Sequence, residues 1–280
     1  MTTRLLLLAL LAGCNQILGL RQTGEVDARF FDAQPDAPYK CPALGTPPAF
    51  SRAVAQHVFQ DADGFAPTAS GHVLARCNDF TSGPSSPICE GPLEGPLVPS
   101  VGLPTLQTFE GYLSGPRPSP DGERLIVRYD DVGTATWTFW YFARNTDGSW
   151  RRLADPPFGY VQDVGTFAMG ATGYIAIVIA SDGTIHEWVD ENDQWRELRQ
   201  HPSFSVPGVL SVTMTWDGLR AIVSRNVGAP LYIDRPDLDS PFGAPVAFEG
   251  APFATDVYMR ADCSGIYMSG LGYVFSAQQR

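Results

Sequence analysis

Lysine is almost missing from this sequence, and charged residues of any kind are scarce. The 280 residues contain one Lys and 18 Arg against 30 Asp and Glu; charged residues make up only 18%, and the formal net charge is −11. Binding to phosphate backbones requires a basic face, which so acidic a chain does not offer. The composition therefore argues against nucleic acid as a main partner.

Several catalytic and metal-binding motifs are also absent. The chain has no G-x-S-x-G nucleophile elbow, H-E-x-x-H zinc motif, Walker A loop, dinucleotide fingerprint or C-x-x-C pair, and its four His are scattered. We therefore expect no metal and no cofactor. After the N-terminus the longest uncharged aliphatic run is Tyr174–Ala180, far below the about 20 residues of a membrane-spanning helix.

Glycine and proline, in contrast, are abundant. The 28 Gly and 24 Pro are typical of a chain rich in turns and poor in long helices. Hydrophobic residues, 44% of the total, suffice for a sizeable core. Length and composition are compatible with a single all-β domain.

Residues 1–13 have the composition of a secretory signal, with a charged start, the apolar run Leu5–Leu11 and small residues after it. The ending Leu11-Ala12-Gly13-Cys14 resembles the lipobox of bacterial lipoproteins. The resemblance implies cleavage before Cys14, a thioether-linked diacylglycerol and an N-acyl chain such as palmitate. It also implies secretion across the inner membrane and a lipid anchor, in the outer membrane because Asn15 rather than Asp follows the cysteine. An ordinary signal peptide that contains a cysteine is the alternative.

Residues 14–45 would form a flexible tether between this lipid and the folded body. They combine Asp and Glu with several Pro and show little periodicity, so they cannot bury enough apolar surface to order themselves. We expect the folded domain to occupy residues 46–280.

The body of the chain repeats itself. The segment Pro118–Val127, PSPDGERLIV, returns as Met214–Val223, MTWDGLRAIV, and in weaker form at three further places. Aligned on one position, the copies lie 51, 51, 45 and 45 residues apart; the aligned residues are Ser70, Asp121, Thr172, Asp217 and Asp262. The pairs Asp121-Gly122 and Asp217-Gly218 predict tight turns, because Gly readily adopts positive φ. About four strands fit one copy, which is the period of propeller blades.

This motif resembles the WD40-like β-propeller repeats of the PD40, or TolB, type, in which it joins the innermost strand of a blade to the next. The resemblance covers about residues 60–280 and implies an all-β propeller. The segment Arg235–Gly243 is also similar to the inter-repeat stretch of propeller lipoproteins from Gram-negative bacteria.

Five turn motifs predict five blades. Six is the alternative, because residues 77–104 are long for a hairpin. The last copy lacks an outer strand, and the segment Ala49–Phe59 precedes the first inner strand. We expect this N-terminal strand to complete the last blade and close the ring without a free edge. A helix at Ser51–Gln60 is the competing local interpretation.

Apart from Cys14, four cysteines remain, an even number in an oxidising compartment. Four cysteines allow three pairings. Cys77 and Cys89 flank a loop rich in Ser, Pro and Gly, which favours a local bridge between them. The remaining bridge, Cys41–Cys263, would staple the closing strand to the last blade. Free thiols or a metal site are the alternatives, the metal site being disfavoured by the absence of C-x-x-C and the scattered His.

Glycoside-active propellers need two or three carboxylates around the central channel. Asp121, Asp217 and Asp262 are equivalent in the repeat, which indicates a role in turns. Asp163 and Asp256 break the repeat, and they are the carboxylates placed to enter the channel. The aromatic residues occur mostly at period two within strands, so blade packing explains them better than glycan binding.

We therefore expect a lipid-anchored extracytoplasmic β-propeller that serves as a protein-interaction or scaffolding module of the cell envelope, without catalysis. Its partner would be another envelope protein or a small ligand at a propeller face. A glycan-binding or glycoside-hydrolase-like propeller that uses channel carboxylates is the alternative. A structural envelope lipoprotein without a specific ligand is a third possibility, since fold alone does not assign function.

Overall fold

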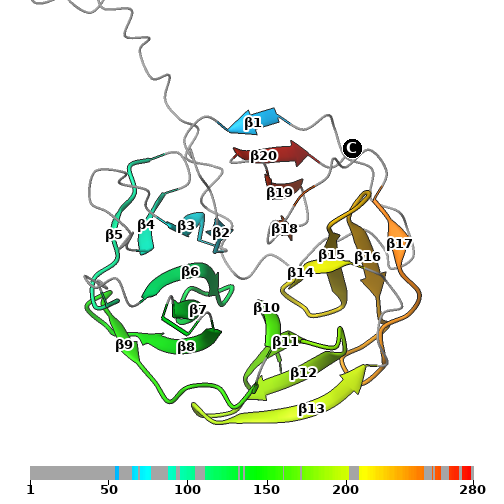
Figure 1. Cartoon of the computed structure of the whole chain (residues 1–280), viewed down its shortest axis with the longest axis horizontal. Helices are drawn as coiled ribbons and strands as arrows, with labels where there is room; N and C mark the ends of the chain where they lie inside the picture. Colours follow the sequence, from blue (N-terminus) through cyan, green and yellow to red (C-terminus); the bar gives the residue numbers. More distant parts are fainter. Residues whose placement is uncertain are drawn as a thin grey trace, which may run out of the picture. The chain divides into compact units, whose positions relative to one another are not determined.

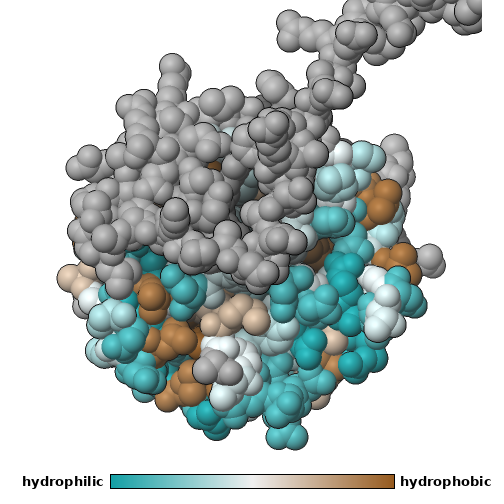
Figure 2. Space-filling model, turned by 180° about the vertical axis from the view of Figure 1, so that it is seen from behind, coloured by the Kyte–Doolittle hydropathy of each residue, from teal (hydrophilic) through white to brown (hydrophobic). Residues whose placement is uncertain are grey.

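The computed structural model describes residues 54–56, 65–68, 70–76, 88–92, 95–104, 111–131, 133–134, 136–159, 161–170, 172–201, 208–248, 254, 256–259, 265–270 and 273–278. The chain divides into two units, Met1–Ala33 and Gln34–Arg280, and all of these residues belong to the second. In this described part no helix is long and apolar enough to cross a membrane. The face seen in Figure 2 is mostly hydrophilic over the described residues, with a few hydrophobic residues among them.

Within the described residues, twenty strands form five antiparallel sheets of four strands each (Figure 1). The first blade, from the innermost strand outward, is β2 (Ala66–Pro67), β3 (His72–Arg76), β4 (Ile88–Pro92) and β5 (Val98–Pro99). The second blade is β6 (Gly111–Pro118), β7 (Arg124–Asp131), β8 (Thr136–Arg144) and β9 (Trp150–Arg152).

The remaining blades follow the same order. The third blade is β10 (Val161–Met169), β11 (Tyr174–Ala180), β12 (Ile185–Asp190) and β13 (Trp195–His201). The fourth is β14 (Val209–Met214), β15 (Arg220–Arg225), β16 (Leu231–Asp234) and β17 (Val246–Ala247). The fifth is β18 (Asp256–Met259), β19 (Gly265–Gly270), β20 (Tyr273–Gln278) and the N-terminal strand β1 (Val54–Gln56).

The N-terminal strand completes the last blade, as the sequence predicts. β1 pairs antiparallel with β20, and Ala55 lies opposite Phe275. Val54–Gln56 is therefore a strand, and the helical interpretation of this segment is wrong. The described part of residues 77–104 supplies β4 and β5 of the first blade, so the described residues form five blades and contain no sixth.

Five hydrophobic clusters lie between neighbouring blades and close the ring. Four of these clusters join the first blade to the second, the second to the third, the third to the fourth and the fourth to the fifth. The last cluster joins Phe65 and Val73 of the first blade to Tyr258 and Tyr267 of the fifth. Burying side chains of this size stabilises the fold by about 1.5–3 kcal/mol each.

Strand β8 shows how one strand serves both of its neighbours. Side chains alternate between the two faces of a strand. Phe139 and Tyr141 pack toward the third blade, whereas Phe142 packs toward the first. Its run of aromatic residues on both faces is therefore explained by burial between two sheets.

The repeated motif forms the turn between the first and second strand of a blade. Asp121 Oδ1 accepts hydrogen bonds from the Glu123 amide at 3.0 Å and from Ser119 Oγ at 2.5 Å. In the fourth blade Asp217 Oδ1 accepts from the Leu219 amide at 3.0 Å and from Thr215 Oγ1 at 2.6 Å. The glycine that follows each Asp has positive φ, 76° at Gly122 and 68° at Gly218, which side chains disfavour.

Candidate channel site

A single arginine occupies the centre of the ring. Arg117 lies on the innermost strand β6 and is 4% exposed. The pairing of β6 with β7 shifts register between Ser114 and Arg117, and Gly115 within this bulge has a φ of 53°. Bulges redirect side chains, and this one turns the end of β6 so that Arg117 reaches the inner strands of other blades.

Arg117 connects three blades through its guanidinium group. Its Nε donates to the Val164 carbonyl on β10 at 3.0 Å. Its Nη2 donates to Asp256 Oδ1 on β18 at 2.9 Å and lies 3.5 Å from Asp163 Oδ1 on β10. Its Nη1 donates to the Tyr258 hydroxyl oxygen. The two carboxylates singled out by the sequence therefore meet at one cation.

Burial controls the electrostatics of this site. Burial raises the pKa of Asp163 to about 6, and the neighbouring Asp256 contributes in the same direction, while Arg117 opposes the shift. Burial also raises the pKa of the Tyr258 hydroxyl above its usual value. For Arg117, burial by itself would lower the pKa, but Tyr258, Asp163 and Asp256 outweigh it and raise the pKa.

One oxygen of Asp163 has no hydrogen-bond partner among the described residues. Asp163 Oδ2 is buried, while the rest of the carboxyl has the long contact of Oδ1 to Arg117 and a backbone hydrogen bond from Val164. A buried carboxyl oxygen without a donor favours the protonated state. Asp163 can therefore exchange a proton near neutral pH, which is what a general acid or base requires.

The other residues predicted from the sequence lie away from this site or outside the described part of the chain. Asp121 and Asp217 form the turns described above. Cys89 lies buried on β4 and is disulfide-bonded to a residue outside the described ones, so the pairing with Cys77 stays a prediction. Outside the described residues lie Cys14, Cys41, Cys77, Asp262 and Cys263. No group of three or more potential metal ligands occurs in the described part.

Sequence reasoning missed Arg117, although a signal for it exists. The residue four positions before each aligned turn residue lies near the end of an inner strand. These five residues are Ala66, Arg117, Ala168, Thr213 and Tyr258. Ala66, Ala168 and Thr213 have small side chains that continue the packing between blades. Arg117 and Tyr258, in contrast, break the repeat and contact each other.

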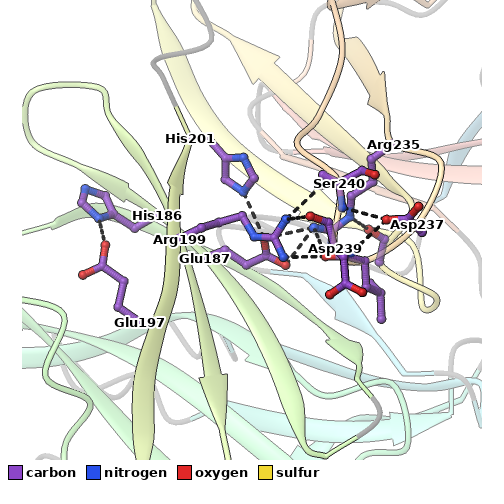
Figure 3. A network of polar contacts seen from close by, with 11 residues as sticks. His186, Glu187, Glu197, Arg199, His201, Arg235, Asp237, Asp239 and Ser240 are labelled. Carbon is purple, nitrogen blue, oxygen red and sulfur yellow. Dashed lines mark hydrogen bonds and ion pairs between the residues drawn. The ribbon is translucent and has the colours of Figure 1, made fainter.

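A second buried charge cluster joins the third and fourth blades. Glu187 on β12 accepts hydrogen bonds from Arg235 Nη1 at 2.9 and 3.0 Å, and both side chains are fully buried. His201 Nε2 lies 3.0 Å from Glu187 Oε2, and Arg199 Nε lies 3.2 Å from the same oxygen. Figure 3 shows Glu187 beneath His201, with Arg199 and Arg235 directed toward it.

This cluster holds the segment Arg235–Gly243 against the third blade. Arg199 donates to the carbonyls of Leu238 at 2.7 Å, Asp239 at 2.7 Å and Ser240 at 3.1 Å. Burial opposes ionisation of Glu187, but His201, Arg235 and Arg199 outweigh it and hold its pKa below the usual value. The segment that resembles an inter-repeat stretch is thus a clamp between two blades.

Comparisons with known proteins give fold-level similarity only. No family model matches the chain. No curated protein matches it either. A gluconolactonase from Xanthomonas campestris is 14% identical, with 78% of this chain and 72% of that chain covered and a TM-score of 0.49.

Two further solved structures are similar to this chain at the level of the fold. A protein of unknown function from Desulfotomaculum acetoxidans is 13% identical, with 74% of this chain and 62% of that chain covered and a TM-score of 0.45. The WD40 repeats of RRP9 are 10% identical, with 84% of this chain and 99% of that chain covered and a TM-score of 0.44. The chain spans 62% to 64% of the length of the first three structures it matches.

Proposed function

We propose that this protein is a lipid-anchored, extracytoplasmic β-propeller that binds another envelope protein and catalyses no reaction. The observation that carries the proposal is the position of Arg117. It engages both channel carboxylates and links three blades, so the groups that a channel enzyme would use as a catalytic pair serve to hold the ring together. Binding then falls to the ends of the propeller, where the turns and loops lie.

The anchor in this proposal rests on the sequence Leu11-Ala12-Gly13-Cys14. Replacing Cys14 by Ala removes the thiol that would carry the lipid. Labelling of cells with a fatty-acid analogue should then lose the band of this protein, and the protein should accumulate in an unprocessed or soluble form. Unchanged labelling and membrane association in the Cys14→Ala variant would refute a lipid anchor at Cys14. That result would not bear on the proposed binding role.

The binding role is tested in intact cells by photocrosslinking. A photoreactive amino acid is placed at exposed positions around the propeller, for example at Glu123, Asp182 and Val227. One or more positions should give a discrete crosslinked protein that an unmodified chain does not give. A scan that covers both ends of the propeller and yields no crosslinked protein contradicts the proposal.

A second candidate function is favoured by Asp163. Its buried, unpartnered Oδ2 and its pKa of about 6 are properties of a carboxyl that can donate a proton to a leaving oxygen. A glycan-binding or glycoside-hydrolase-like propeller would use Asp163 as acid and Asp256 as the second carboxylate. Turnover of a panel of fluorogenic glycosides, lost in the Asp163→Asn variant and retained in Asp155→Asn, would favour this candidate over the binding module.

A further inference from the structure

One end of the propeller carries an apolar centre within an acidic surround. The innermost strands of blades two to four finish at three turns, at residues 119–123, 170–173 and 215–219, and we call this end the turn face. In the repeat, the residue before each aligned position is apolar throughout. These five residues are Ala69, Pro120, Ala171, Trp216 and Ala261.

Three apolar side chains of the turn face are accessible around the axis. Met169, the last residue of β10, is 41% exposed, which is high for a large hydrophobic side chain at the end of an inner strand. Its amide donates to the Trp216 carbonyl at 2.8 Å, so the ends of two inner strands lie side by side here. Trp216 and Pro120 are half-buried. Trp and Met are among the residues enriched at protein interfaces.

The turn of the second blade is joined to the same centre. Tyr174 lies opposite Met169 in the β10–β11 pairing. Its hydroxyl donates to Asp121 Oδ2 at 2.7 Å, across the boundary between blades three and two. A side-chain hydrogen bond, a strand pairing and a backbone hydrogen bond thus connect Asp121, Tyr174, Met169 and Trp216 across three blades, and we call these four residues the strip.

Carboxylates surround this strip. The described turns and loops at the turn face of these three blades carry eight carboxylates that are exposed or half-buried. They are Asp121, Glu123, Asp147, Glu191, Asp193, Asp217, Asp237 and Asp239.

Four arginines of this face already have partners. Arg124 pairs with Asp193 at 2.9 Å and Arg196 pairs with Glu191 at 2.9 Å. Arg144 pairs with Glu90 at 2.6 Å, and Arg199 is held by the carbonyls of the clamp. Of the eight carboxylates, Glu191 and Asp193 are neutralised in this way and the other six are in no ion pair among the described residues. The surround therefore keeps a net negative charge, although Arg151 on β9 is also exposed at this end.

We infer that the turn face docks a segment of a partner protein in which Lys or Arg residues flank an apolar or aromatic side chain. This inference rests on the proposed binding function and names its partner chemistry. The apolar side chain would pack on Met169 and Trp216, since a flexible thioether adapts to varied shapes and aromatic anchors supply most of the energy of small interfaces. The flanking cations would meet the carboxylates, which speeds association and selects against acidic partners.

The same charge disfavours two other classes of ligand. Anionic lipid headgroups and nucleic-acid phosphates are both repelled by an acidic surface. A small uncharged ligand would leave the carboxylates unused. A basic and apolar protein segment is the occupant that uses both features of the turn face.

The test uses the purified full chain in detergent and a fluorescent peptide in which arginine alternates with leucine and tryptophan. A peptide with glutamate in place of arginine is the control ligand. The basic peptide should bind, the acidic one should not, and the affinity should fall when salt rises from about 0.05 M to about 0.3 M, because salt screens exposed charges.

Three variants locate the binding surface. Met169→Ala and Glu123→Lys should each weaken binding about fivefold or more, since they remove an apolar anchor or reverse a surround charge. Val227→Ser changes a 74% exposed apolar residue in the β15–β16 turn, at the opposite end of the propeller, and should leave binding unchanged. Absence of binding by the basic peptide, or equal affinities in all three variants, overturns the inference.

Failure of this inference is distinguishable from failure of the proposed function. If photocrosslinking captures a partner from Val227 or Asp182 but not from Met169 or Glu123, the protein binds a partner through the other end. The assignment of the binding site to the turn face is then wrong. If no position captures a partner, the binding function itself fails.

Discussion

Arg117 and Asp256 lie on blades that are not neighbours in the ring, yet Arg117 Nη2 donates to Asp256 Oδ1 at 2.9 Å. The second and fifth blades are separated by the first on one side and by the third and fourth on the other. Their bond therefore crosses the centre of the propeller. Hydrophobic packing holds each blade to its neighbours, whereas this ion pair ties together blades that share no cluster.

We predict that Arg117→Met destabilises the protein by about 3–5 kcal/mol, because it leaves two largely buried carboxylates without this cation. The free energy of unfolding from urea titration at neutral pH measures this effect. The triple change Arg117→Met, Asp163→Asn and Asp256→Asn removes the charges together and should recover most of the loss. A loss below about 1 kcal/mol for Arg117→Met alone would mean that the cross-ring tie contributes little.

Asp163 should make stability depend on pH with a definite sign. Its pKa rises from 3.8 in the unfolded chain to about 6 in the folded one, so the folded state binds the proton more tightly. Its contribution is therefore favourable at low pH and is lost as pH rises through about 6. At pH well above 6 the ionised, largely buried carboxylate costs about 3 kcal/mol.

The Asp163→Asn variant isolates this contribution. Carboxyls with lowered pKa, such as Glu187, act in the opposite sense, so the difference between variant and wild type is the quantity to measure. Relative to wild type, Asp163→Asn should be more stable at pH 7.5 than at pH 4, by on the order of 2 kcal/mol. The exposed Asp155→Asn change should show no such difference. A constant offset between Asp163→Asn and wild type would contradict the raised pKa.

The clamp between blades three and four offers a matched pair of substitutions. Glu187→Gln keeps the size of the side chain but leaves the fully buried Arg235 without its anion, at an expected cost of about 3–5 kcal/mol. Glu197→Gln breaks the 2.6 Å pair with His186 on the surface of the same sheet, also drawn in Figure 3. That change should be within the error of the measurement, because solvent screens exposed pairs. Equal unfolding midpoints for the two variants would contradict a structural role for the clamp.

The staple between Cys41 and Cys263 remains a prediction from the sequence. If the bridge forms, it constrains the unfolded chain over a long loop, and its loss costs about 3–5 kcal/mol. Cys263→Ser should then lower the melting temperature under oxidising conditions and leave it unchanged under reducing ones. Equal melting temperatures of variant and wild type in both conditions would contradict a stabilising disulfide between Cys41 and Cys263.

The repeat made the architecture predictable from the sequence. Turn chemistry is local: an Asp that accepts the amide two residues ahead, followed by Gly at positive φ, encodes its geometry within a few residues. Two such turns, at Asp121 and Asp217, together with three weaker copies of the motif, predict the number of blades. The missing outer strand of the last blade fixes how the ring closes, because an unpaired edge would be exposed without β1.

The candidate site was predictable only in part, for a physical reason. Asp163 and Asp256 stand out because they break the repeat. Their shared partner, Arg117, lies 46 and 139 residues away from them in the chain, so the sequence alone does not indicate the contact. A bulge at Gly115 redirects Arg117, and bulges are not encoded by the alternation of side chains. For the same reason the sequence indicates that Arg235–Gly243 is special without indicating that Glu187, on another blade, holds it.

The closing strand provides the last test. Ala55 is the middle residue of β1 and lies opposite Phe275 on β20. Ala55→Pro removes an amide donor and disfavours pairing in the strand, so it should free the edge of β20. We expect the melting temperature to fall by roughly 5–10 °C, and concentration-dependent oligomers to form through the open edge. Ala55→Val, which favours a strand, should retain the wild-type elution volume in size-exclusion chromatography and the wild-type melting temperature in calorimetry. If Ala55→Pro also behaves as wild type, the ring is held by its five hydrophobic clusters, and the β1–β20 pairing is not needed to keep it closed.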